Sequence, residues 1–148
     1  MTQEEKQQLW ECICEMVPHD TIVHHLKVNV DYKLNGVLNN TLPITGEKEQ
    51  LIYLKTLNDD FQMIPTGPKD VRPYLRPMSS MIKEERMEYN KFNDFGSANL
   101  RRYEYEDFIL YIPAFERIDW LNAHHFDYRG LIEKGLALEA PEGMYKTE

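Results

Sequence analysis

The chain has 148 residues, of which 42% are hydrophobic and 28% are charged, and its formal net charge at pH 7 is −8. This length and composition predict a single folded domain whose hydrophobic core needs neither a metal ion nor a disulfide bond for stability. The negative charge argues against a surface that neutralises nucleic-acid phosphates, and no apolar run is long enough to predict a membrane-spanning helix.

The N-terminal segment carries the local signals of a helix start and of a helix end. Thr2 and Glu5 have the spacing of a capping box, in which each side chain binds the backbone amide of the other residue. Apolar residues follow at helical spacing, and Pro18 disfavours helical geometry in the residue before it. The pattern therefore predicts a helix over residues 3–16.

Cys12 and Cys14, the only cysteines of the chain, fall on this predicted helix. Side chains two positions apart on a helix point in widely different directions, so we expect one buried and one partly exposed thiol, not a metal or redox pair. Two cysteines do not make a disulfide framework, and the polar N-terminal segment is not typical of a signal peptide. The cytoplasm is therefore the expected location.

Polar and apolar residues alternate along residues 21–34, which predicts a long, bent, half-buried strand. The pair Asn35-Gly36 favours a hairpin turn, although the register of the returning strand stays open. Residues 51–57 and 61–64 predict two further strands. One face of the first strand is predicted to carry Ile22, His24, Leu26, Val28, Val30, Tyr32 and Leu34.

Residues 72–77 have the sequence RPYLRP, in which each arginine precedes a proline. A residue before proline is pushed into an extended conformation by the proline ring. We therefore expect a stiff, extended connector that covers the sheet or links two parts of the chain.

The second half of the chain predicts two helices around one strand. A helix is expected to begin at Ser79 or Ser80. Residues 103–112 predict a strand that has apolar side chains on both faces, and Pro113 suits the first turn of the next helix. Residues 136–140 predict either a short strand or an extended tail that docks on the body.

The order of these elements predicts an α+β fold. We expect a small antiparallel twisted sheet or a partly open barrel, packed by about three helices. The single domain spans residues 1–148, with a helix and a β-rich part over residues 1–76 and a helix-strand-helix part over residues 77–148. The strand order is left open.

Three polar residues, His124, His125 and Asp127, lie close together near the end of the last predicted helix. Imidazole and carboxylate groups bind zinc, so a small metal-dependent hydrolase around His124 and Asp127 is one hypothesis. Adjacent residues on a helix point about 100° apart, however, which favours a helix end in which His125 packs on the core. His24 is expected to be a half-buried histidine that bonds a backbone group.

Arginine and tyrosine residues alternate in two segments, an arrangement that can hold single-stranded nucleic acid by charge and stacking. Nearby acidic residues and the negative net charge argue against this interpretation. A second hypothesis is therefore a nucleic-acid-associated regulator, which uses Arg72, Arg76, Arg101 and Arg102. The same speculative binding set includes Tyr74, Tyr103 and Tyr105.

Two segments of the sequence, RPYLRPMSSMIKEERMEY (72–89) and DWLNAHHFDYRGLIEKGLALEAPEGMY (119–145), carry a resemblance to a known group. The chain resembles small uncharacterised proteins of phages, prophages and mobile elements of gut anaerobic bacteria. These segments span about a third of the chain. The resemblance implies a small intracellular protein from a mobile or phage-derived locus, and it implies no catalytic residue, cofactor or substrate.

The leading hypothesis is a non-catalytic, acidic protein-binding module with no cofactor and no metal ion. It would present either a face of the small sheet or the 72–77 connector to another protein, whose identity the sequence does not give. The negative charge serves either solubility alone or an acidic face that attracts a basic partner. The oligomeric state is left open.

Overall fold

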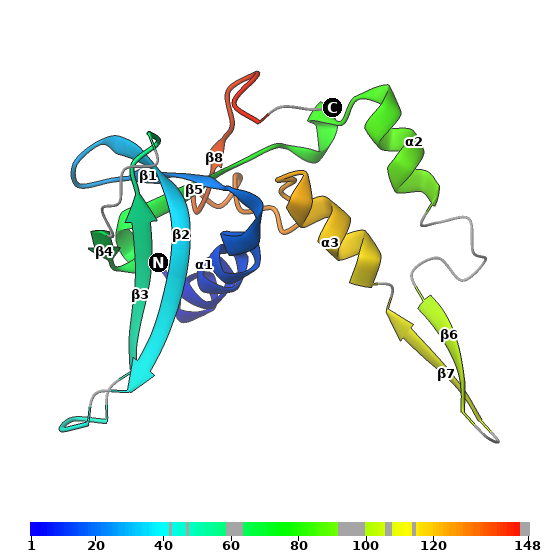
Figure 1. The fold of residues 1–148 in the computed structure, drawn as a ribbon, viewed down its shortest axis with the longest axis horizontal. Helices are drawn as coiled ribbons and strands as arrows, with labels where there is room; N and C mark the ends of the chain where they lie inside the picture. The colour runs from blue at the N-terminus through cyan, green and yellow to red at the C-terminus, as the bar shows by residue number, and fades with distance from the viewer. Residues whose placement is uncertain are drawn as a thin grey trace.

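The computed structural model describes residues 1–41, 43–46, 48–58, 64–91, 100–105, 108–113 and 115–145. It confirms an α+β fold with a mixed, mostly antiparallel six-stranded sheet, which is open and does not close into a barrel. The sheet has the order β4-β3-β2-β1-β5-β8, and a separate two-stranded sheet consists of β6 and β7 (Figure 1). The six strands are β1 (Ile22–His25), β2 (Val30–Thr41), β3 (Lys48–Lys55), β4 (Ile64–Thr66), β5 (Val71–Leu75) and β8 (Leu138–Glu139).

The N-terminal helix α1 (Gln3–Met16) has the predicted limits. Its capping box is formed, because the Glu5 amide donates to Thr2 Oγ1 at 3.1 Å and the Thr2 amide donates to Glu5 Oε2 at 2.8 Å. Cys12 is buried and Cys14 is half-buried, as expected for thiols two positions apart on a helix.

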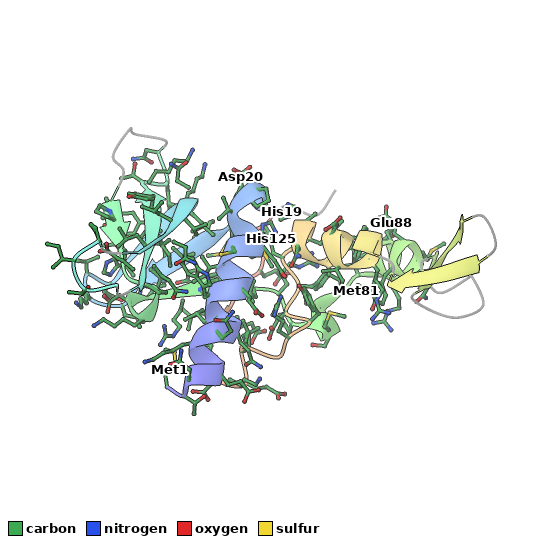
Figure 2. The ribbon with its side chains drawn as sticks, turned by 90° about the horizontal axis from the view of Figure 1, so that it is seen from below. Met1, His19, Asp20, Met81, Glu88 and His125 are labelled. Carbon is green, nitrogen blue, oxygen red and sulfur yellow. The ribbon has the colours of Figure 1, made fainter. Side chains whose placement is uncertain are left out.

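Helix α1 packs against one face of the six-stranded sheet and fills the hydrophobic core (Figure 2). Two apolar residues of the helix, Leu9 and Ile13, are almost completely inaccessible to solvent. The C-terminal part of the chain contributes Leu131 and Leu136 to this core. The strands contribute Val23, Leu34, Ile52, Leu54, Val71 and Leu75 to the same cluster.

The prediction of one long strand over residues 21–34 is wrong. Residues 26–29 form a turn between β1 and β2, closed by the Asn29 amide, which donates to the His25 carbonyl at 2.9 Å. Asn29 has a φ of 55°, a left-handed conformation that asparagine tolerates better than most residues. The turn changes which alternate residues face inward, so Val23 and Leu34 are buried while Leu26 and Val28 are exposed.

The Asn35-Gly36 pair does not form the predicted turn. Both residues lie inside β2, where the pairing with β3 shifts register between Leu34 and Gly36. The extra residue of such a bulge bends the strand and increases its local twist. Of the two strands predicted next, residues 51–57 correspond to β3, and residues 61–63 lie outside the described part of the chain.

The second half of the chain differs from its prediction at the start of its first helix and around one hairpin. The helix begins at Lys83, not at Ser79 or Ser80, because Met78–Ser80 form a separate 3-10 turn. Residues 103–112 form parts of two strands, β6 (Leu100–Tyr105) and β7 (Phe108–Pro113), so the expected single strand is wrong. Pro113 ends β7, and the following helix α3 (Phe115–Ala123) begins after it. Figure 1 shows this hairpin at the end of the molecule away from the six-stranded sheet, beyond α2 (Lys83–Lys91) and α3.

Residues 136–140 contain the short strand β8, which pairs in parallel with β5. One of the two alternatives for this segment is thereby confirmed. Among the helices that the structure describes, none combines the length and the apolar character needed to span a membrane.

Candidate functional site

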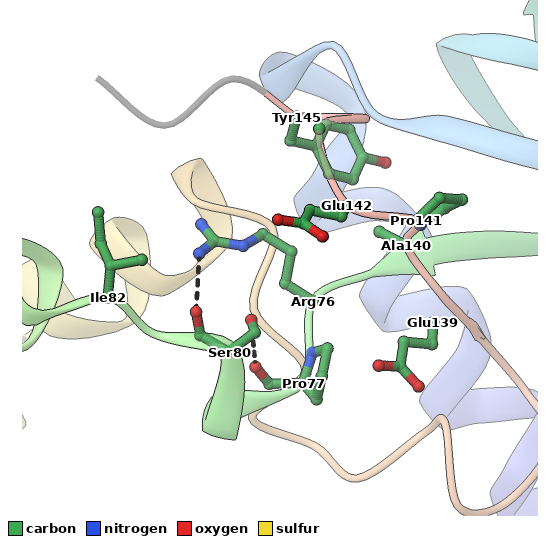
Figure 3. A pocket seen from close by; sticks show the side chains of 10 residues that line it. Arg76, Pro77, Ser80, Ile82, Glu139, Ala140, Pro141, Glu142 and Tyr145 are labelled. Carbon is green, nitrogen blue, oxygen red and sulfur yellow. Dashed lines mark hydrogen bonds between the residues drawn. The ribbon is translucent and has the colours of Figure 1, made fainter.

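A groove of about 750 Å³ opens where β5 and β8 separate. The last ladder hydrogen bond is donated by the Ala140 amide to the Leu75 carbonyl at 2.8 Å. Pro77 follows β5 and Pro141 follows β8 in the sequence, and neither residue has an N–H group that could extend the pairing. The two segments separate after these prolines. The groove is lined by Arg76, Pro77, Ser80 and Ile82 on one side and by residues 139–143 with Tyr145 on the other (Figure 3).

Arg76 lies between the two sides of the groove and is held by an ion pair. Its Nη1 and Nη2 atoms each donate to one carboxylate oxygen of Glu85 at 2.7 Å. Both side chains are buried, and the guanidinium group lies 4.2 Å from the centre of the Phe126 ring. Burial acts to raise the pKa of Glu85, but the hydrogen bonds from Arg76 and from the Ile82 amide hold it below its ordinary value.

The structure does not support the predicted nucleic-acid role of Arg76, because its guanidinium group is buried against Glu85. Arg72 donates from Nε to the Gly135 carbonyl and from Nη1 to the Lys69 and Val71 carbonyls. An arginine fixed in this way has few donors left for phosphate groups.

The predicted binding residues are divided between two separate sheets, and only Tyr74 shares a strand with Arg72. Tyr74, on β5, donates its hydroxyl hydrogen to Asp31 Oδ1 at 2.9 Å. Arg101, Arg102, Tyr103 and Tyr105 belong to β6 of the separate two-stranded sheet. The side chains of this strand lie outside the described part of the structure.

The residues of the predicted metal site have separate structural partners. The His124 ring stacks on Trp120 with ring centres 4.0 Å apart, and its Nδ1 lies 2.8 Å from the Trp120 carbonyl oxygen. Asp127 accepts hydrogen bonds from the backbone amides of Leu131 and Ile132. Within the described ranges, no group of three or more His, Cys, Asp or Glu residues is arranged to hold a metal ion.

Arg129, two residues after Asp127, forms ion pairs with α1. Its Nη2 lies 2.6 Å from Glu15 Oε1, and its Nη1 lies 3.3 Å from Glu11 Oε2. The contact ties the segment after α3 to the N-terminal helix across more than a hundred residues of sequence. No spacing rule for neighbouring residues could have found it.

His24 differs from its prediction because it bonds a carboxylate, not a backbone group. Its Nδ1 lies 2.7 Å from Asp31 Oδ1, the same oxygen that accepts from the Tyr74 hydroxyl. The three side chains come from β1, β2 and β5 and lie on the sheet face opposite α1. The turn at residues 26–29 brings Asp31 opposite His24, so a single long strand could not have produced this pair.

Tyr145 fixes the C-terminal wall of the groove to the sheet. Its hydroxyl oxygen accepts from the Ile22 amide at 2.9 Å, and its hydroxyl hydrogen is donated to the Tyr74 carbonyl at 2.8 Å. The hydroxyl thus bridges β1 and β5. Burial raises the pKa of Tyr145, which therefore stays neutral and keeps its donor near pH 7.

Replacing Tyr145 by phenylalanine should lower the free energy of unfolding by about 1–3 kcal/mol, because the Ile22 amide and the Tyr74 carbonyl lose a shared partner. Urea unfolding measures the loss. Tyr32→Phe is a suitable control, since no partner of the Tyr32 hydroxyl occurs in the described residues. Equal stability losses in the two variants would contradict the bridging role.

His125 packs against Tyr145, on the C-terminal wall of the groove. Its ring stacks on Tyr145 with ring centres 3.7 Å apart, and its Nε2–H donates to the His19 carbonyl at 2.6 Å (Figure 2 labels both histidines). His125 has a φ of 63° at the end of α3, which turns the chain toward Phe126. The prediction that His125 packs on the core is consistent with its burial.

Comparisons with protein-family models, with curated proteins and with solved structures gave no match to this chain.

Proposed function

We propose that this protein is a non-catalytic interaction module that holds a segment of a partner protein in the groove between residues 76–82 and 139–145. The observation that carries the proposal is the groove itself, which is concave, preformed and lined by both apolar and polar groups. One charged residue of its lining, Arg76, is already held by Glu85, so this side chain needs no ordering when a partner binds.

Apolar side chains at the groove support a protein partner. Ile82 lines it and is 43% exposed, and Met78, four residues earlier in the turn Met78–Ser80, is 36% exposed. An exposed large side chain beside a concavity is an anchor point for a partner residue, because docking removes its apolar surface from water.

The groove is a better candidate than the open sheet face, the other surface that the sequence suggested. Leu38 lies on that face, opposite Leu51 of β3, and is 42% exposed. Concave surfaces exclude water from more of a bound segment than an open sheet face does. Leu38 and Ile82 have nearly equal exposure, so they form a matched pair for a test.

The test is a selection of short random peptides displayed on phage, with the purified protein as bait. We expect peptides enriched on the wild type to bind Ile82→Asp about tenfold more weakly, because an apolar contact is replaced by a charge. The same peptides should bind Leu38→Asp as they bind the wild type. Circular dichroism checks that both variants are folded.

Two outcomes would count against the proposal. If Leu38→Asp loses binding and Ile82→Asp keeps it, the sheet face is the binding surface. If no peptide is enriched over an unrelated bait, the module does not recognise linear segments. The context in a mobile or phage-derived locus stays a prediction, which the identity of neighbouring genes tests.

A further inference from the structure

We propose that the groove selects a partner segment that carries a lysine or arginine side chain. This inference rests on the proposed function and names the chemistry of the partner. It depends on two carboxylates, Glu139 and Glu142, which line the groove on its C-terminal side. Figure 3 shows Ile82 on one side of the groove and Glu142 and Tyr145 on the other, with Arg76 between them.

The two carboxylates of the groove differ from other acidic residues near the core in having no cationic partner. Glu85 is paired with Arg76, and Glu15 is paired with Arg129. Glu139 and Glu142 are exposed, and neither has an ion-pair partner among the residues that the structure describes. Their charges are therefore available to a ligand.

Glu139 and Glu142 determine the electrostatic field inside the groove. The positive charge of Arg76 is compensated by the bidentate contact with Glu85, which leaves that pair with little net charge. Glu139 and Glu142 add two negative charges, in a protein whose net charge is already −8. A concave surface with one sign of charge concentrates the opposite charge, which here is a cation.

The apolar part of the lining favours a ligand that has carbon surface as well as positive charge. Ile82, Pro77 and Pro141 contribute carbon surface to the same groove. Lysine and arginine combine an aliphatic stem with a charged end, so a stem can lie on the prolines and Ile82 while the end reaches a carboxylate. A membrane surface carries anionic lipids and would be repelled, so the occupant is a basic segment of a protein.

The experiment uses fluorescence anisotropy with three labelled peptides of equal length, in which leucine alternates with lysine, glutamine or glutamate. We expect the lysine peptide to bind the wild-type protein more tightly than the glutamine peptide, and the glutamate peptide to bind weakest. Binding of the lysine peptide should weaken as salt is raised, because the contacts at the groove mouth are screened.

Glu139→Gln and Glu142→Gln should each weaken binding of the lysine peptide by about twofold to fivefold, which is the range for partly solvated ion pairs. The double variant should weaken it by about tenfold, since the two contacts act on one ligand. Glu133→Gln is the matched control: Glu133 is exposed, lies in the same C-terminal segment and does not line the groove. This control should leave binding unchanged.

The outcomes separate this inference from the proposed function. If the three peptides bind equally and Ile82→Asp weakens all of them, the groove holds partner segments but does not select a cation, and only this inference fails. If none of them binds and the phage selection enriches nothing, the proposed function fails as well. Spermidine, a cation without apolar side chains, is the last probe. If spermidine displaces the lysine peptide at equal concentration, the groove binds cations in general, and the proposal that it holds a basic protein segment is wrong.

Discussion

Replacing Arg76 by alanine should lower the free energy of unfolding by about 3–5 kcal/mol, the cost typical of removing one partner of a buried ion pair. Glu85 would keep its burial but lose the two guanidinium donors, Nη1 and Nη2, which lie 2.7 Å from its oxygens. The variant would also lose the contact of the guanidinium group with Phe126. Urea denaturation followed by tryptophan fluorescence measures the change.

A double variant shows whether the loss comes from the unpaired carboxylate. Arg76→Met combined with Glu85→Leu removes both charges and keeps similar volume, so it should recover most of the stability lost in Arg76→Ala. The pair also links the residue after β5 to the first turn of α2, where Glu85 accepts from the Ile82 amide at 3.0 Å. A loss below about 0.5 kcal/mol in Arg76→Ala, the usual range of surface changes, would contradict a stabilising role.

The parts of the fold that follow from sequence are those with local signals. Helix α1 could be predicted to the residue, because its capping box and the proline after it lie within the segment that they define. The extended course of residues 72–75 follows from the prolines, and these residues lie in β5. Side-chain directions on the N-terminal helix also predicted that one cysteine is buried and the other partly exposed, but not which of the two is buried.

Alternation failed where a turn interrupted it without a change in composition. Leu26 and Val28 are apolar residues in a turn, and they continue the alternating pattern although no strand is present there. Asn29 was the local signal, since asparagine tolerates the left-handed conformation that closes this turn. The stronger Asn35-Gly36 signal was overridden by pairing with β3, which makes those residues a bulge.

The candidate groove could not be predicted, because its parts meet only in the folded chain. Tyr145 and Ile22 are 123 residues apart in sequence, and no spacing rule relates them. The sequence predicted an extended course for residues 72–77, but residues 72–75 belong to an inner strand of the sheet and are not a connector. Arg76, which was assigned to a speculative binding set, is buried. Its pairing with Glu85, nine positions later, needs the turn at Met78–Ser80 and the start of α2.

Acidification from about pH 7 to about pH 4 should destabilise the protein through His125 by about 3 kcal/mol. Burial lowers the pKa of His125 from 6.5 to about 4, despite the hydrogen bond to the His19 carbonyl, and the charges of Arg76 and His124 lower it further. The unfolded chain binds a proton at higher pH than the folded one. The contribution of neutral His125 to the free energy of unfolding is therefore complete above about pH 6.5 and is lost as the pH falls toward 4.

The variant His125→Asn isolates this effect, because asparagine tolerates the φ of 63° at this position and does not titrate. Unfolding free energies of both proteins are compared at about pH 7 and at about pH 4.5, where most paired carboxylates are still ionised. The wild type should lose more stability over this interval than the variant. Parallel pH profiles would show that other groups account for the acid sensitivity.

The same histidine connects acid stability with the groove. Its ring stacks on Tyr145, and Tyr145 both bridges β1 and β5 and lines the groove. A protonated His125 must regain water, and it can do so only if this stack opens. Loosening of the C-terminal wall should therefore accompany the stability loss in the wild type. A pH titration followed by tryptophan fluorescence and far-ultraviolet circular dichroism measures this loosening. The wild type should show a step between about pH 6.5 and about pH 4.5, and His125→Asn should show none.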